Sequence, residues 1–279
     1  MVWYYILLYA VIQGITEFLP ISSSGHLVLA HEWVNSQADT MSAADQTARW
    51  AEDAVIDIAV HVGTLFAVLL YFRHDFLAMA KGLLRPKSVE GSASKNMIFY
   101  MIIGSLPVIL CGYLLHLWQP NWLRSPEIVA WTTLIFGFVL WMADRFGKTI
   151  KPIEQMDMKA ALLIGLAQVL ALVPGTSRSG ITMTAARGLG FTREAAAKFS
   201  LFLSVVAISG AGVLAGRDVL LSGNPVLGTQ SLIAVLVSAV AGYISISLMI
   251  NWLKRHDFTP FVVYRALLGL VLLLVFYLN

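Results

Sequence analysis

The chain has 279 residues, of which 58% are hydrophobic and only 13% are charged, and its mean hydropathy is +0.76. Soluble domains usually contain about 25% charged residues, so this composition excludes an ordinary soluble enzyme and indicates an integral membrane protein. The net charge of +3 is small, and we expect no nucleic-acid partner.

Apolar segments of two kinds follow one another along the chain. A membrane-spanning helix needs roughly 20 mostly apolar residues. Six segments meet this requirement: 51–72, 97–118, 126–146, 195–216, 231–253 and 259–278. Two others, 3–34 and 158–190, are interrupted by Pro20 and Pro174, and proline disfavours helix at the preceding residue. The first apolar run lacks a basic start, so we expect no cleavable signal peptide.

We expect each interrupted segment to form a hairpin of two short helices that enters and leaves the membrane on one side. Such non-helical backbone is tolerated only where protein or trapped water satisfies it. The predicted fold is therefore an all-α polytopic membrane protein. It has about six transmembrane helices plus two re-entrant broken-helix hairpins, within a single integral membrane domain over 1–279.

The two interrupted segments contain copies of one motif, displaced by 155 positions. The copies coincide at Gln13 and Gln168, Ser22 and Ser177, Ser24 and Ser179, and Gly25 and Gly180. Polar groups are costly inside a membrane. A duplicated cluster of them therefore predicts a functional site.

Loop charge predicts the orientation of the chain. Lys and Arg concentrate in 73–95, 144–159 and 254–255, which we expect to be cytoplasmic. The segments 35–50, 119–125 and 217–230 contain one Arg each and should lie outside. Three spans then separate the motif copies, which makes the halves 1–146 and 147–279 an inverted repeat with a site near the membrane midplane.

The residue types in the motifs suit an anionic ligand. Gln13 and Glu17 are four residues apart and share a helix face. Ser22, Ser23 and Ser24 can cap a helix that we expect to begin near His26. In the second copy, Ser177 and Ser179 flank Arg178, whose planar charged group suits phosphate oxygens. Two such helix N-termini predict a phosphate or diphosphate site.

Structural interpretations of the same residues remain open. Glu17 and Arg178 could form a buried ion pair that only joins the repeats, although this would not explain His26 or the hydroxyls. Asp53, Asp57 and His61 recur every four residues; they face the site, line an outer vestibule or have a purely structural role. Tyr264 and Arg265 lie inside or near the end of the last span, where Arg265 either reaches the interface or pairs.

At these residues the sequence resembles the undecaprenyl-diphosphate phosphatase family, also called the bacitracin-resistance protein family. The first motif runs from Gln13 through Glu17 and Phe18-Leu-Pro20 to Gly25-His26, and the second is Pro174-Gly-Thr-Ser-Arg-Ser-Gly180. The likeness continues through 62–68, 198–200 and 258–265. Many family members have Glu where this chain has Gln13, so the resemblance assigns the main carboxylate role to Glu17.

The resemblance implies hydrolysis of undecaprenyl (C55 polyprenyl) diphosphate to the monophosphate and inorganic phosphate. This reaction recycles the lipid carrier of cell-wall synthesis at the outer, periplasmic face of the bacterial plasma (inner) membrane and confers bacitracin resistance. The resemblance also implies a divalent cation, Mg or Ca, contacted by Glu17. The expected partners are the polyprenyl diphosphate and membrane lipid, and a homodimer stays open.

Two sets of site residues follow. The predicted catalytic residues are Glu17, Ser23, His26 and Arg178. The predicted substrate-binding residues are Gln13, Ser22, Ser24, Thr176, Ser177 and Ser179. The nucleophile could be Ser23, His26 or water, with a pair of Ser23 and His26 preferred. The alternative function is a secondary transporter or flippase for a lipid phosphate or another anion, because inverted repeats with broken helices are typical of transporters.

Overall fold

The computed structural model describes residues 3–23, 25–27, 43–84, 88–118, 125–222 and 225–278, with side chains except at 43–54 and 210–227. This part of the chain is helical and contains no named strand, only an isolated bridge between Lys151 and Phe191. The helices are α1 Trp3–Thr16, α3 Ala43–Tyr71, α4 Arg73–Leu84, α5 Val89–Trp118, α6 Pro126–Phe146, α7 Met158–Gln168, α8 Arg178–Gly188, α9 Arg193–Ser222, α10 Pro225–Leu253 and α11 Thr259–Leu278. The short 3-10 helices are η2 Ile153–Gln155 and η3 Val169–Leu172. The predicted all-α class is confirmed.

Four helices of the described chain are long and apolar enough to cross a membrane, and all four were predicted. They are Val89–Trp118, Pro126–Phe146, Gly228–Leu253 and Thr259–Leu278. The predicted span 51–72 lies in α3, which turns by 75° into α4; this bent pair counts as a fifth candidate. The predicted span 195–216 lies in α9, a helix of 30 residues, which is about 45 Å long. The chain is a multi-pass membrane protein.

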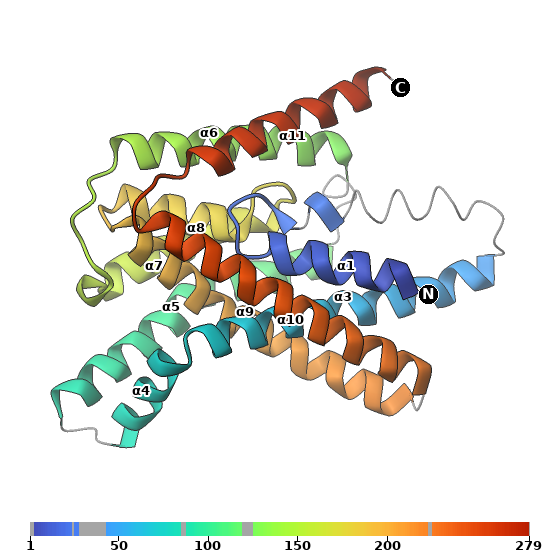
Figure 1. Cartoon of the computed structure of the whole chain (residues 1–279), viewed down its shortest axis with the longest axis horizontal. Helices are drawn as coiled ribbons and strands as arrows, with labels where there is room; N and C mark the ends of the chain where they lie inside the picture. The colour runs from blue at the N-terminus through green and yellow to red at the C-terminus, as the bar shows by residue number, and fades with distance from the viewer. Residues whose placement is uncertain are drawn as a thin grey trace.

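The long helices enclose the short ones. In Figure 1, α6 and α11 lie side by side along one edge, and α10 crosses the molecule against α1 and α3. Between these groups α8 contacts α6, α7 and α9, and eight of its 11 residues are buried. A polar helix start at Arg178 is thereby placed inside the protein.

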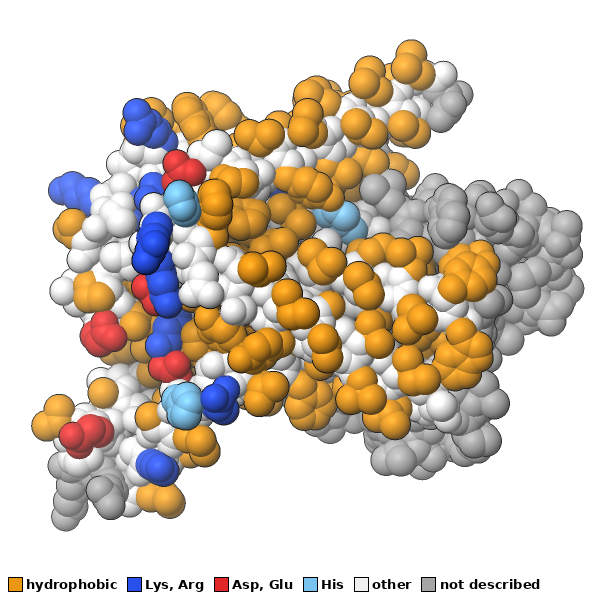
Figure 2. Space-filling view, viewed as in Figure 1, with side chains coloured by type: hydrophobic (Ala, Val, Ile, Leu, Met, Phe, Trp, Pro, Cys, Tyr) orange, Lys and Arg blue, Asp and Glu red, His pale blue; other side chains and the backbone are white. Residues whose placement is uncertain are grey.

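Charged side chains gather at one end of the molecule. Figure 2 shows Lys, Arg, Asp and Glu side chains mainly at the left, whereas hydrophobic side chains cover most of the remaining described surface on this face. The left end contains α4 and the junctions before α7 and after α10 (Figure 1). The three basic segments predicted to share one side of the membrane, 73–95, 144–159 and 254–255, therefore lie together at this end.

The two interrupted segments enter from opposite ends, as an inverted repeat requires. In Figure 1, α1 runs inward from the right, whereas α7 runs inward from the charged left end and α8 returns to it. The first hairpin turns at 17–22 and the second at 173–177, where regular helix stops. Both turns lie in the interior of the molecule.

A buried ionic cluster holds the second hairpin at the charged end. Arg187, at the end of α8, is fully buried and donates from Nε to Asp144 Oδ1 at 2.8 Å. Arg193 donates to the same oxygen at 2.8 Å, and the Phe258 amide donates to Asp144 Oδ2 at 3.2 Å. One carboxylate on α6 thus fixes α8, α9 and the start of α11, which in turn fixes the direction in which α8 points.

Candidate active site

The two helix breaks turn on equivalent serines with the same unusual backbone. Ser22 has φ +73° and Ser177 has φ +70°, and they are the two non-glycine residues with positive φ in the described chain. This left-handed region is strained for residues with a Cβ, and such strain clusters at functional sites. Each serine accepts a hydrogen bond at Oγ from the amide three residues later, at Gly25 (3.3 Å) and Gly180 (3.1 Å). The same local cap therefore starts a helix in both copies.

The helix after the first break begins earlier than predicted. Ser23 is already helical, with Ser22 in the capping position, so the expected start near His26 was wrong by about one turn. The reason is that a capping serine precedes the first helical residue directly. As a consequence Ser23 and Arg178, each the residue after its cap, are the first helical residues of their helices.

A buried arginine ties the two breaks together. Arg265 on α11 is fully buried, and its described hydrogen bonds all go to backbone carbonyls. The acceptors are Pro20, Thr132, Thr133, Gly175 and Thr176, at 2.9–3.4 Å. Of the two expectations for Arg265, reaching the interface was wrong, and its partners are carbonyls rather than a charged side chain. Its N–H groups instead satisfy the Pro20, Gly175 and Thr176 carbonyls at the two breaks, and the remaining two bonds, to Thr132 and Thr133, fix the guanidinium against α6.

A direct contact between the breaks reinforces this tie. Ser179 Oγ donates to the Leu19 carbonyl at 2.9 Å, and it lies 3.1 Å from Ser177 Oγ. Since the Ser179 proton is used on Leu19, the proton between the serines belongs to Ser177. The hydroxyls of both predicted ligands thus stabilise the meeting of the two copies.

Glu17 is the centre of the polar cluster that results. Its side chain is 8% exposed. Arg178 Nη2 donates to Oε1 at 2.5 Å, and Ser23 Oγ donates to Oε2 at 2.8 Å. Gln13 Nε2 also donates to Oε2, at 2.9 Å, across the predicted helix face. The ion pair of Glu17 and Arg178 therefore forms, as the structural interpretation expected. Glu17 also accepts a hydrogen bond from the Ser23 hydroxyl, which an ion pair that only joins the repeats does not require.

His26 lies at this site but faces other partners than those expected. Its Nδ1 is 2.7 Å from the Ser22 carbonyl, and its Nε2 is 2.6 Å from the Tyr264 hydroxyl. A carbonyl only accepts, so Nδ1 carries a proton and Nε2 of the neutral ring accepts from Tyr264. The structure therefore does not bring His26 into the expected pairs with Ser23 or Glu17, because both ring nitrogens are already engaged.

A second histidine occupies the place beside Glu17. His61 Nε2 on α3 is 3.9 Å from Glu17 Oε2, and its Nδ1 is 2.6 Å from the Asp57 carbonyl. The four-residue recurrence on α3 was the available signal, and it left open whether these side chains face the site. His61 does so.

Tyr264 was the site residue that the sequence did not indicate, because nothing in the sequence near 264 points to a contact with His26.

The remaining predicted ligands line the same region. Gln13 Oε1 and Thr176 Oγ1 are buried and have no hydrogen-bond partner in the described chain. Ser24 lies outside the described residues. Gln168, the counterpart of Gln13, donates to the Gly104 carbonyl at 3.3 Å and has no carboxylate four residues later. The two copies have thus diverged, and the carboxylate belongs to the first copy alone.

This arrangement has the parts needed for phosphoryl transfer. Ser23 is a hydroxyl already hydrogen-bonded to a carboxylate, the usual pairing of a nucleophile with a base. Arg178 stands at the N-terminus of α8, where the helix dipole and free N–H groups attract anions. Phosphoryl transfer depends largely on positioning and on stabilisation of charge, and this cluster supplies both.

Comparisons with known proteins show the family of this chain. Residues 6–271 match the family described as bacitracin resistance protein BacA. The chain is 43% identical to the undecaprenyl-diphosphatase of Alteromonas mediterranea over 272 residues, which cover 96% of each chain. It is 42% identical to that of Hahella chejuensis over 99% of each chain, and 42% identical to undecaprenyl-diphosphatase 1 of Rhodospirillum rubrum over 98% of this chain and 95% of that one. This protein therefore belongs to the BacA family of bacitracin resistance proteins.

Proposed function

We propose that this protein hydrolyses undecaprenyl diphosphate to undecaprenyl phosphate and inorganic phosphate, and so contributes to bacitracin resistance. Family membership and three relatives named for this activity support the substrate. The observation that carries the chemistry is the contact of Glu17 with both Ser23 and Arg178 where two helix starts meet. The reaction is a displacement at the terminal phosphorus.

In the first half-reaction Ser23 Oγ attacks the terminal phosphorus. Its proton passes to Glu17 Oε2, with which it already shares a hydrogen bond of 2.8 Å. The bond from phosphorus to the bridging oxygen breaks, and undecaprenyl phosphate leaves with the proton that Glu17 has accepted. Arg178 and the amides at the start of α8 stabilise the charge on the transferring group. Burial strengthens these interactions, because little water competes with them.

In the second half-reaction water attacks the phosphoserine. Glu17 accepts a proton from the water and returns one to Ser23 Oγ, so inorganic phosphate leaves and the enzyme is restored. We assign the hydrogen-bonded pair of His26 and Tyr264 to the orientation of phosphate or water, with the Ser22 carbonyl holding the ring through Nδ1. This mechanism favours Ser23 over His26 as nucleophile, because the serine is the group in contact with a base.

A divalent cation, Mg or Ca, fits the oxygen groups around Glu17. Both ions prefer oxygen ligands, and Mg is commonly held by one or two carboxylates together with substrate phosphates. Glu17 supplies a carboxylate, and the buried Gln13 Oε1 beside it is an acceptor with no partner in the described chain. No group of three His, Cys, Asp or Glu in that part of the chain is placed to bind a metal alone. When bound, the cation would neutralise diphosphate charge. Chelation should stop phosphate release, and added Mg or Ca should restore it.

The site is assigned to the outer, periplasmic face of the bacterial plasma membrane. The gathering of the three basic segments at one end supports a cytoplasmic position for that end. The first hairpin enters from the opposite end (Figure 1) and contains Glu17 and Ser23. Single cysteines in 73–95 of a Cys111→Ser protein should react with a membrane-impermeant thiol reagent only after the membrane is opened. Labelling in intact cells would reverse the orientation.

The central experiment measures phosphate release from undecaprenyl diphosphate by the purified protein in detergent. Separate Ala substitutions of Glu17, Ser23 and Arg178 should each lower turnover by orders of magnitude. A radiolabelled phosphoenzyme should form in the wild type and be lost in Ser23→Ala. Normal turnover of Ser23→Ala would exclude the serine mechanism. Flux of lipid phosphate into liposomes without phosphate release would instead identify the transporter alternative.

A further inference from the structure

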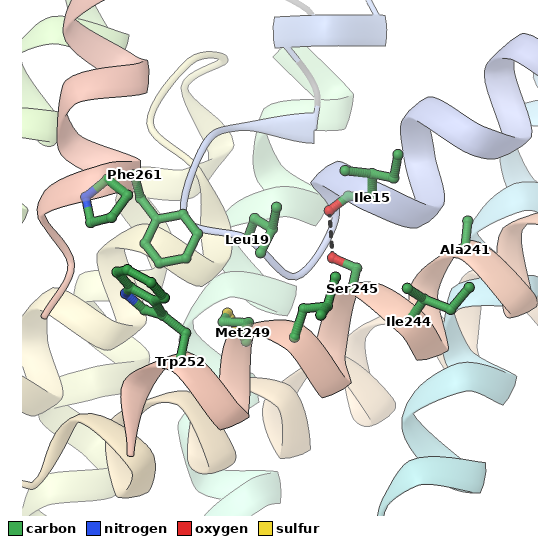
Figure 3. Close-up of a pocket in the computed structure, with 10 residues that line it drawn as sticks. Ile15, Leu19, Ala241, Ile244, Ser245, Met249, Trp252 and Phe261 are labelled. Carbon is green, nitrogen blue, oxygen red and sulfur yellow. Dashed lines mark hydrogen bonds between the residues drawn. The ribbon is translucent and has the colours of Figure 1, made fainter. Parts of the chain in front are cut away.

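An apolar groove opens on the side of the protein next to the first helix break. It has a volume of about 580 Å³ and lies between α1, the break, α10 and the start of α11. Figure 3 shows Leu19 and Phe261 lying over α10, with Trp252 facing Phe261. The lining consists of Ile15, Leu19, Ala241, Ile244, Ser245, Leu248, Met249, Trp252, Pro260 and Phe261. Its one hydroxyl, of Ser245, donates to the Ile15 carbonyl at 2.8 Å, so the groove offers only apolar contacts along this wall.

Two elements that line the groove also border the active site. On the break, Leu19 lies two residues after Glu17, and its carbonyl accepts from Ser179. On α11, Phe261 lies three residues before Tyr264 and hence on the same helix face. Tyr264 contacts His26 at 2.6 Å. The groove therefore lies beside the elements that carry Glu17 and Tyr264, within reach of an apolar chain attached to a diphosphate bound there.

The groove runs along α10 toward the polar surface of the protein. From Ala241 to Trp252 it follows α10 for 11 residues, or about 16 Å. At its end Trp252 Nε1 donates to the Asp257 carbonyl at 2.9 Å, and the indole stacks on His256. Lys254 and Arg255 follow directly, so this end lies at the basic, polar surface. A groove of this length holds the first part of a long chain, and the rest must extend into the bilayer.

We propose that this groove binds the part of the substrate's isoprenoid chain nearest the diphosphate. The inference rests on the proposed function and adds a chain-binding site to it. Lipid is as apolar as the groove, so the hydrophobic effect supplies little affinity. The gain is positional: a chain packed against Leu19 and Phe261 holds the diphosphate in register with Ser23, and correct positioning of reactants contributes strongly to rate. Binding energy from a remote part of the substrate is thereby used at the reacting atoms.

The test compares two substrates and two matched variants. Ile244→Trp fills the groove from an exposed position on α10, and Leu236→Trp makes a similar change on the same helix outside it; the two residues are 52% and 57% exposed. Each protein is assayed with undecaprenyl diphosphate and with dimethylallyl diphosphate, whose five-carbon chain is too short to fill the groove. We expect Ile244→Trp to lower the ratio of the two kcat/KM values by about tenfold, equivalent to about 1.4 kcal/mol. Leu236→Trp should leave this ratio at the wild-type value.

If the wild type hydrolyses only the long-chain diphosphate, the kcat/KM for undecaprenyl diphosphate alone is compared between Ile244→Trp and Leu236→Trp, and equal values overturn the inference. An equal loss with both substrates, or no loss, in a folded Ile244→Trp protein would assign the groove to ordinary membrane lipid and overturn the inference. A selective loss that Leu236→Trp also shows would overturn it as well, because the effect would then belong to the lipid-facing surface in general. If the wild type hydrolyses neither diphosphate, the proposed function itself fails. A wild type that hydrolyses both with an unaltered ratio in Ile244→Trp removes the groove inference alone.

Discussion

Ser23 and Arg178 occupy the same position in the two motif copies, 155 residues apart, and they contact the two oxygens of one carboxylate, Glu17. Each is the first helical residue after a serine with positive φ. The inverted repeat thus presents two equivalent helix starts to one point. The first copy supplies the hydroxyl of Ser23 there, and the second supplies the guanidinium group of Arg178. The two copies of one structural element therefore have different chemical roles.

The charge of Glu17 should be essential to turnover. Glu17→Gln keeps the size of the side chain but cannot accept the Ser23 proton, so kcat should fall by about 100- to 10,000-fold, the range for general-base catalysis. Phosphate release in detergent measures this effect. Glu194→Gln makes the same change at an exposed position in the first turn of α9 and should retain wild-type kcat. Retention of kcat in Glu17→Gln would remove Glu17 from the mechanism.

Tyr264 should act through His26. Tyr264→Phe removes the hydroxyl 2.6 Å from His26 Nε2 but retains the ring stacked on the imidazole at 5.7 Å. We expect kcat to fall by about tenfold, the loss of one hydrogen bond worth about 1.4 kcal/mol. In His26→Ala the further change Tyr264→Phe should have no additional effect, because contacting residues are not additive. Additive losses in this double-mutant cycle would show that Tyr264 acts independently.

The serines at the breaks should prefer glycine to alanine as a replacement. At Ser22 and Ser177, Ala loses the cap and keeps a Cβ at positive φ, whereas Gly adopts that backbone freely and is itself an acceptable cap. Ala should therefore lower the free energy of unfolding by about 1 kcal/mol more than Gly does. Unfolding in mixed detergent micelles measures the difference. The exposed helical Ser92 on α5 is the control, since Gly should be the worse replacement there.

Arg265 should be needed for the fold rather than for one chemical step. Arg265→Met removes the donors to five carbonyls of both breaks and of α6. Leaving the buried carbonyls of the breaks unpaired, at Pro20, Gly175 and Thr176, should lower the free energy of unfolding by at least about 3 kcal/mol. Arg255→Met, in the exposed turn before α11, should leave stability unchanged. Wild-type stability in Arg265→Met would mean that the breaks hold without this tie.

Much of the architecture could be predicted because its signals are local. Four predicted spans coincide with long apolar helices, since span length and hydropathy are read directly from consecutive residues. Both breaks occur where proline, hydroxyl and glycine residues follow one another, because these residues restrict the backbone regardless of the rest of the chain. That Gln13 and Glu17 share one face was predicted for the same reason, since it follows from helical spacing alone, and the two side chains are in contact.

The amino-acid sequence by itself determined that this is a membrane protein with two equivalent broken helices and a polar cluster at each. Only the tertiary structure decided which polar groups meet. Glu17 and Arg178 are 161 residues apart, Arg265 and Pro20 are 245 apart, and His26 and Tyr264 are 238 apart. These contacts depend on how separate helices pack, and no local propensity encodes that packing. For this reason the expected contact between His26 and Glu17 is absent. His26 contacts Tyr264 instead, and Glu17 contacts Ser23 and lies 3.9 Å from His61.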